Sequence, residues 1–220
     1  MLVQVTSGAV LGVDAYLVRV EVDMSNGLPA MHVVGLAESA VREGRERVRA
    51  ALANSGFRLE PRKITINLAP ADIRKEGSAF DLPLAIGLIG VYGLADVRRL
   101  AGTCLVGELG LDGEVRPVRG VLSVAVRCAK EGVRTLIVPP GNAREAGVVD
   151  GIDVRIAPTL LHVVRHLRGE AMLPSPSRAA DDEAGRCLSR RLRPLNHRFP
   201  RLLKYTNVVS VKGAKAARPS

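Results

Sequence analysis

The stretch that decides the fold begins Ile64-Thr-Ile-Asn-Leu-Ala-Pro-Ala-Asp72 and continues Ile73-Arg-Lys-Glu-Gly77 and Ser78-Ala-Phe-Asp-Leu-Pro-Leu84. Apolar and polar residues alternate from Ile64 to Leu68, which predicts a strand with one buried face. Pro70 ends that strand, because proline has no N–H to donate to a sheet.

A buried helix is predicted directly after the polar loop that runs from Ala71 to Gly77. Ser78 and Asp81 stand at capping-box spacing, and Pro83 falls in the first turn, where its missing N–H costs little. The residues from Leu82 to Val91 leave the helix no polar face, so we expect it to be buried. A strand, a charged loop and a buried helix start are a common scaffold for a functional site.

Strands and helices alternate through the second half of the chain. Alternation of this kind favours βαβ crossovers. We therefore predict an α/β fold with a mixed sheet. The expected strands are Thr103–Leu109, Thr135–Val138 and Asp153–Ile156, and the expected helices are Val121–Lys130 and Leu160–Leu167.

The first half is predicted to contain strands at Leu2–Val5, Val10–Val22 and Met31–Val34. The turn signal Ser25-Asn-Gly27 predicts a hairpin between the last two of these strands. A helix is predicted from Glu38 to Ser55.

The charge of +10 is concentrated at the end of the chain. From Pro174 onward there are eleven Lys or Arg and three Asp or Glu, so the rest is close to neutral. We predict one domain over residues 1–169 and a basic, Pro- and Arg-rich tail over 170–220, either disordered or frameshifted. Aromatic residues make up 3% of the chain and Trp is absent, which argues against an aromatic platform for single-stranded nucleic acid.

The three cysteines are far apart in the sequence and form no zinc or disulfide pattern. We therefore expect a cytoplasmic protein with no metal site and no membrane segment. His162 and His166 lie four apart on a predicted helix, but no third ligand accompanies them.

A cluster of basic residues, Arg42, Arg45 and Arg49, shares one face of the predicted helix that starts at Glu38. This face is a candidate for nucleic-acid binding. The alternative, which we favour, is a solvated helix surface, because acidic residues interleave the arginines.

Nucleotide-binding motifs are absent from the sequence. The dipeptide Gly-Lys never occurs, so there is no P-loop, and there is no Gly-x-Gly-x-x-Gly. We expect no cofactor in this chain.

Several ordered stretches resemble the N-terminal domain of the ComM/YifB family, the magnesium-chelatase-like AAA+ ATPases. Ala37 departs from the family pattern, which usually has Pro after Gly-Leu. The matching stretches are Ser25-Asn-Gly-Leu-Pro29, Val34-Gly-Leu36, Arg45-Glu-Arg-Val-Arg49, Asn54-Ser-Gly-Phe57, Ile64 to Asp72, Lys75-Glu-Gly77, Phe80-Asp-Leu-Pro83 and Gly107-Glu-Leu109.

The resemblance implies a fold similar to the proteolytic domain of Lon protease. It also implies an AAA+ module as partner, which binds ATP and magnesium and forms homo-oligomers, with DNA as a further partner. ComM-like relatives are DNA branch-migration helicases of natural transformation. We expect the likeness to end near Gly169, so we interpret the chain as a fragment or a frameshift product. Translation of the downstream DNA in all frames tests this.

The Lon likeness raises the alternative of a Ser–Lys peptidase. When the Lon motifs are laid on this sequence, the nucleophile falls on Ala79 and the lysine on Leu122. Neither side chain can perform that chemistry. Ser78 with Lys75 as base would require a shifted loop, so we favour a non-catalytic domain.

The candidate contact loop consists of Asn67, Asp72, Lys75, Glu76 and Asp81. The alternative is purely structural: Asp81 caps a helix, Asn67 bonds to the backbone, and the Lys75–Glu76 pair is solvated.

Overall fold

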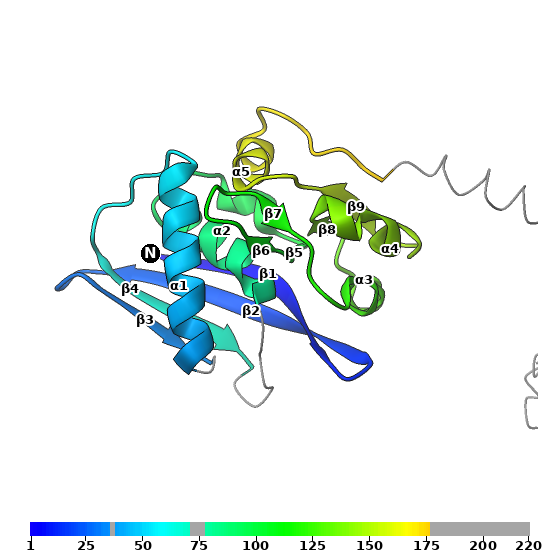
Figure 1. Cartoon of the computed structure of the whole chain (residues 1–220), viewed down its shortest axis with the longest axis horizontal. Coiled ribbons are helices and arrows are strands. Elements are labelled where there is room, and N and C mark those ends of the chain that lie inside the picture. The colour runs from blue at the N-terminus through cyan, green and yellow to red at the C-terminus, as the bar shows by residue number, and fades with distance from the viewer. Residues whose placement is uncertain (36–37, 71–77, 177–220) are drawn as a thin grey trace, which may run out of the picture. The chain divides into compact units, whose positions relative to one another are not determined.

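The computed structural model describes residues 1–35, 38–70 and 78–176, and within this part a mixed sheet of seven strands forms the centre (Figure 1). The strand order is β3-β4-β2-β1-β5-β8-β9. The predicted α/β architecture with a mixed sheet is confirmed. The strands are β1 Leu2–Leu11, β2 Asp14–Ser25, β3 Ala30–Val34, β4 Lys63–Ala69, β5 Thr103–Leu105, β8 Thr135–Val138 and β9 Asp153–Ile156.

Three βαβ units build most of the sheet. In these units α1 connects β3 to β4, α3 lies between β5 and β8, and α4 lies between β8 and β9, and each pair of strands is parallel. The pairs β1–β2 and β2–β4 are antiparallel, and β1 pairs in parallel with β5. The helices are α1 Glu38–Asn54, α2 Asp81–Val91, α3 Val121–Lys130, α4 Ala143–Gly147 and α5 Leu160–Arg168.

The predicted hairpin after Ser25 is wrong. Strand β3 does not pair with β2; β4 lies between them and pairs with both. A hairpin does form earlier, between β1 and β2, at Gly12, whose φ of 64° suits a tight turn. This turn divides the single strand that we predicted over Val10–Val22. Turn signals are local, whereas the choice of neighbouring strand depends on residues far away in the sequence.

The predicted strand Thr103–Leu109 is also divided. Its second part, β6 Glu108–Leu109, leaves the large sheet and forms a separate hairpin with β7 Val115–Arg116. This hairpin packs near the start of α2 and supplies part of the site described below.

The two faces of the sheet bury two different hydrophobic clusters. Leu105 and Ile137 belong to the cluster that contains α1, α2 and α5, whereas Cys104 and Leu136 belong to the cluster under α3 and α4. Neighbouring residues of one strand thus point to opposite faces. Strands β5 and β8 therefore read as nearly continuous apolar runs, whereas the edge strand β9 alternates charged and apolar residues.

Helix α2 is the centre of the larger cluster, and all eleven of its residues are buried, as predicted. Gly87 allows its close packing on the sheet, because a Cβ there would lie 2.6 Å from Val22 Cγ2. The predicted capping box is wrong. A 3₁₀ turn, Ser78–Phe80, precedes the helix, and the N-cap residue Phe80 has no capping side chain.

Two of the predicted segments lie wholly or largely outside the residues that the structure describes. These are the loop 71–77 and the tail from residue 177 onward. Among the described helices, none combines the length and the apolar character needed to span a bilayer.

Candidate functional site

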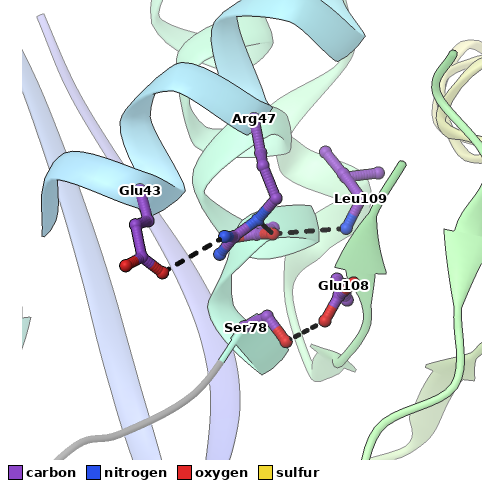
Figure 2. A network of polar contacts seen from close by, with 6 residues as sticks. Glu43, Arg47, Ser78, Glu108 and Leu109 are labelled. Atoms are coloured by element: carbon purple, nitrogen blue, oxygen red, sulfur yellow. Dashed lines mark hydrogen bonds and ion pairs between the residues drawn. The ribbon is translucent and has the colours of Figure 1, made fainter. Parts of the chain in front are cut away.

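A buried ion pair joins α1 to α2 (Figure 2). Arg47 Nε lies 2.7 Å from Asp81 Oδ2, and Arg47 Nη2 lies 3.3 Å from Asp81 Oδ1. The backbone N–H of Leu109 in β6 donates to the same carboxylate at 3.3 Å. The side chain of Asp81 is 3% exposed, so this residue is not part of an exposed contact loop. It connects three elements instead.

The environment of Asp81 combines burial with compensation. Burial raises the pKa of the Asp81 carboxyl above its ordinary value, and the Arg47 guanidinium and the Leu109 N–H partly offset that rise. The hydrogen bond to Asp81 raises the pKa of Arg47. Glu43, one turn earlier on α1, lies 3.8 Å from Arg47 and forms an i,i+4 ion pair with it.

A glycine on α1 leaves room for this pair. A Cβ at Gly44 would lie 3.3 Å from Asp81 Oδ1, closer than most side-chain contacts. Gly44 and Arg47 lie three apart, so they face α2 together. The helix therefore presents one small residue and one cation to the same carboxylate.

Asn67 lies on the other, polar face of the sheet. Its amide donates to Glu21 Oε2 at 2.9 Å, and Gln4 donates to Glu21 Oε1 at 3.2 Å. The three residues are opposite one another on β4, β2 and β1. Asn67 thus bonds to a side chain, not only to backbone as the structural alternative assumed. Asp72, Lys75 and Glu76, the other members of the predicted contact loop, lie outside the described residues.

A cavity of about 510 Å³ lies where the Lon likeness places a peptidase site. Ser78, Ala79 and Glu108 line it together with Arg119 and Val121. Leu122, the other aligned position, does not line this cavity, and its side chain is 43% exposed. Only one of the two aligned positions therefore faces the cavity.

The hydroxyl of Ser78 is held by a neighbour from the β6–β7 hairpin. It donates to the Glu108 carboxylate, as Figure 2 shows. No lysine is among the described residues that line the cavity. Within the described residues the cavity therefore has no amine that would activate a serine in a Ser–Lys dyad, and Lys75 lies outside them.

The predicted nucleic-acid face lies on α1 on the side away from Asp81. Arg45 and Arg49 are exposed and line a groove of about 600 Å³ beside residues 57–62. The side chain of Arg42 lies outside the described part. Arg58 and Arg62 also line the groove, so the structure adds two arginines that the sequence pattern did not connect with this face.

The fold agrees with the comparisons to known proteins. A family model described as subunit ChlI of Mg-chelatase matches residues 20–142, which is more than half of the chain. The chain belongs to this family. Since the match spans β4, α1 and α2, it includes the stretch that carries the buried ion pair.

Three curated relatives are similar to this chain, two of them at about 40% identity or more. Competence protein ComM of Haemophilus influenzae is 39% identical over 97% of this chain and 40% of its own length. The uncharacterized protein YifB of Escherichia coli is 45% identical over 76% of this chain and 33% of its own length. A Lon protease of Mycolicibacterium smegmatis is 26% identical over 68% of this chain and 20% of its own length. The resemblance to the ComM/YifB family is confirmed.

These matches correct one expectation about the end of the likeness. The ComM match covers 97% of the chain, so it continues beyond Gly169, where we expected the likeness to end. The Arg- and Pro-rich composition obscured it. The chain spans between a third and two fifths of the length of ComM and YifB.

Arg47 and Glu108 were not predicted as site residues. Both stand in the stretches that carried the family resemblance, Arg45–Arg49 and Gly107–Leu109. Their partners, Asp81 and Ser78, lie 34 and 30 residues away. The signal that could have identified them is that each lies as a charged residue within a stretch that matches the family.

Proposed function

We propose that this chain is the non-catalytic, Lon-like domain of a ComM/YifB-like AAA+ ATPase that moves DNA branches during natural transformation. The domain serves the motor as a rigid docking unit. ATP binding and hydrolysis belong to the motor module, and the domain contributes neither a nucleotide site nor a peptidase site.

The observation that carries this proposal is the composition of the cavity around Ala79. A serine-type peptidase needs a nucleophile and a base within hydrogen-bond reach of each other. Here the aligned nucleophile is alanine, and the neighbouring Ser78 hydroxyl donates to the carboxylate of Glu108, not to the amine that a Ser–Lys dyad requires. The likeness to the competence protein ComM over most of the chain supports the link to natural transformation.

The residues present do not fit ATP and magnesium. Without the dipeptide Gly-Lys there is no lysine to contact the phosphates of a P-loop nucleotide. Among the described residues, no three His, Cys, Asp or Glu side chains form a group that could hold a metal ion.

A chimera tests the docking role. The matched segment of H. influenzae ComM is replaced by the full chain, and transformation by DNA carrying a resistance marker is measured. We expect the chimera to restore transformation above the level of a strain that lacks ComM. A matched chimera with Arg47→Leu should fail, because it loses the tie between α1 and α2. A folded, expressed chimera without activity would refute the docking role.

A peptidase assay tests the absence of catalysis. We expect the purified chain to leave fluorescein-labelled casein intact at all times at which Lon protease with ATP degrades it. Casein turnover that disappears in Ser78→Ala would show that the cavity is a working active site.

DNA binding by the basic tail is a second candidate function. The supporting observation is the surplus of eight positive charges from Pro174 onward. Binding of this kind should weaken steeply as salt rises, because bound phosphates release counterions. Fluorescence polarisation with duplex DNA, across a salt series, measures it. Replacing Arg190, Arg191 and Arg193 by Gln should lower the salt slope, and an unchanged slope would exclude the tail.

A further inference from the structure

The groove beside α1 has features of a binding site that the proposed docking role does not explain. One wall is α1, with Arg45, Arg49 and Ala53, and the opposite wall is the segment from Phe57 to Arg62 that leads into β4. The first residues of the edge strand β3 close one end. The volume of about 600 Å³ is sufficient for several side chains of a partner.

The floor of the groove is apolar and well fixed. It is made by side chains that belong to the main hydrophobic cluster or pack against it, so it cannot move far without disturbing the core. Tyr92 adds an aromatic edge, and its hydroxyl donates to the backbone carbonyl of Glu60. The floor residues include Met31, Val48, Leu52, Phe57, Ile64 and Leu88.

The rim carries a surplus of positive charge. Its two carboxylates are already paired: Glu46 lies 3.5 Å from Arg45, and Glu60 lies 3.2 Å from Arg62. None of the ion pairs found among the described residues involves Arg49 or Arg58, and both are exposed. Two guanidinium groups therefore face solvent above an apolar floor.

This combination selects the class of partner. A nucleic acid presents phosphates at every step of its backbone but no aliphatic side chains that could fill the apolar floor. A peptide can place its acids opposite the free guanidiniums and insert apolar side chains into the floor between them. Carboxylates also match the planar, two-pronged donors of arginine.

We infer that the groove is a docking site for a partner segment that alternates acidic and apolar side chains. Arg49 and Arg58 bind the carboxylates of this segment. Its apolar side chains contact the floor of the groove around Leu52 and Tyr92. The inference goes beyond the proposed function and does not rest on it, because every residue that it uses is among the described residues.

Fluorescence polarisation with a defined probe tests the inference. The probe is the fluorescein-labelled peptide Asp-Asp-Leu-Glu-Asp-Leu-Phe-Asp, titrated with the full chain at low and at physiological salt. We expect saturable binding. The double variant Arg49→Glu with Arg58→Glu should weaken binding about tenfold or more, since it replaces two attractions by two repulsions.

A matched control variant separates the groove from the general charge of the chain. Arg144 on α4 and Arg165 on α5 are exposed and do not line the groove. Their double reversal, Arg144→Glu with Arg165→Glu, changes the net charge by the same amount. It should alter the affinity for the peptide less than about twofold. An equal loss in both double variants would overturn the inference.

Two further probes complete the test. A peptide in which serine replaces the leucines and phenylalanine should bind weakly, because it cannot fill the apolar floor. A single-stranded oligonucleotide of equal charge should be insensitive to the Arg49 and Arg58 reversals. Loss of oligonucleotide binding in that variant, without loss of peptide binding, would assign the face to nucleic acid. Absence of peptide binding would also overturn the inference.

Discussion

One short run of α1 serves two regions of the molecule that differ in every physical respect. Arg47 turns inward to the buried Asp81, and its guanidinium is engaged by a carboxylate at 2.7 Å. Arg45 and Arg49, two residues to either side, line a solvent-exposed groove. The same residue type thus stabilises the fold at one position and remains available for binding at the next.

The comparison shows that burial of the partner, more than the presence of an arginine, decides its role. Asp81 cannot be hydrated, so it depends on Arg47 for compensation. The carboxylate beside Arg45 belongs to the exposed Glu46, which water can solvate just as well. Breaking the first contact should therefore affect stability, whereas breaking the second should affect only binding.

The largest expected effect is that of Arg47→Leu. The substitution leaves the Asp81 carboxylate buried without a cation, which typically costs about 3 to 5 kcal/mol of unfolding free energy. Because Arg47 is itself 29% exposed and water can enter, we expect the lower end, about 3 kcal/mol. Urea denaturation at neutral pH measures it. Asp81→Asn should cost less, about 1 to 2 kcal/mol, because the amide still accepts from Leu109.

A loss from Arg47→Leu no greater than that from Asp81→Asn would contradict the idea that an uncompensated charge is the cause. It would show instead that the contact acts through packing of the arginine stem.

The second effect is the pH dependence of that loss. The pKa of Asp81 is raised in the folded protein, and removal of Arg47 raises it further. A raised carboxyl pKa contributes stability below the pKa of the unfolded chain and loses it as pH rises through the folded-state pKa. The destabilisation by Arg47→Leu should therefore shrink as pH falls from about 8 to about 5. Denaturation across this range, with Asp81→Asn combined with Arg47→Leu as control, measures the change. A deficit that is independent of pH would exclude protonation of Asp81.

The smallest effect belongs to the exposed side of the comparison. Arg49→Leu should change the unfolding free energy by less than about 0.5 kcal/mol, because no ion pair found among the described residues depends on it. The measurement is the same urea titration. A loss close to that of Arg47→Leu would mean that the two regions are not separate.

The sequence was a good guide where the signal is local. The helix predicted over Val121–Lys130 is α3 with its observed bounds, and the alternation from Ile64 predicted β4. Strand order was not predictable in this way. The turn at Ser25-Asn-Gly27 is real as a chain reversal signal, but it says nothing of β4 entering between β2 and β3.

The site divides in the same way. Asp81 was assigned to an exposed contact loop, because the sequence pattern does not show its partner Arg47, which lies 34 residues away. Charge patterning on α1 identified Arg45 and Arg49 but did not single out Arg47. The sequence of a helix shows which side chains share a face. It does not show which other helices or strands pack against that face.

The position of β1 in the sheet has a further consequence for how the molecule tolerates shortening. This strand comes first in the chain, yet it joins β2 on one side and β5 on the other. Met1, directly before it, donates from its terminal ammonium to the carbonyl of Met24 at 2.9 Å. Deletion of β9 removes an edge strand and leaves the other strands of the sheet paired. Deletion of β1 removes the strand that joins the two halves of the sheet, so that no backbone hydrogen bonds connect β2 with β5.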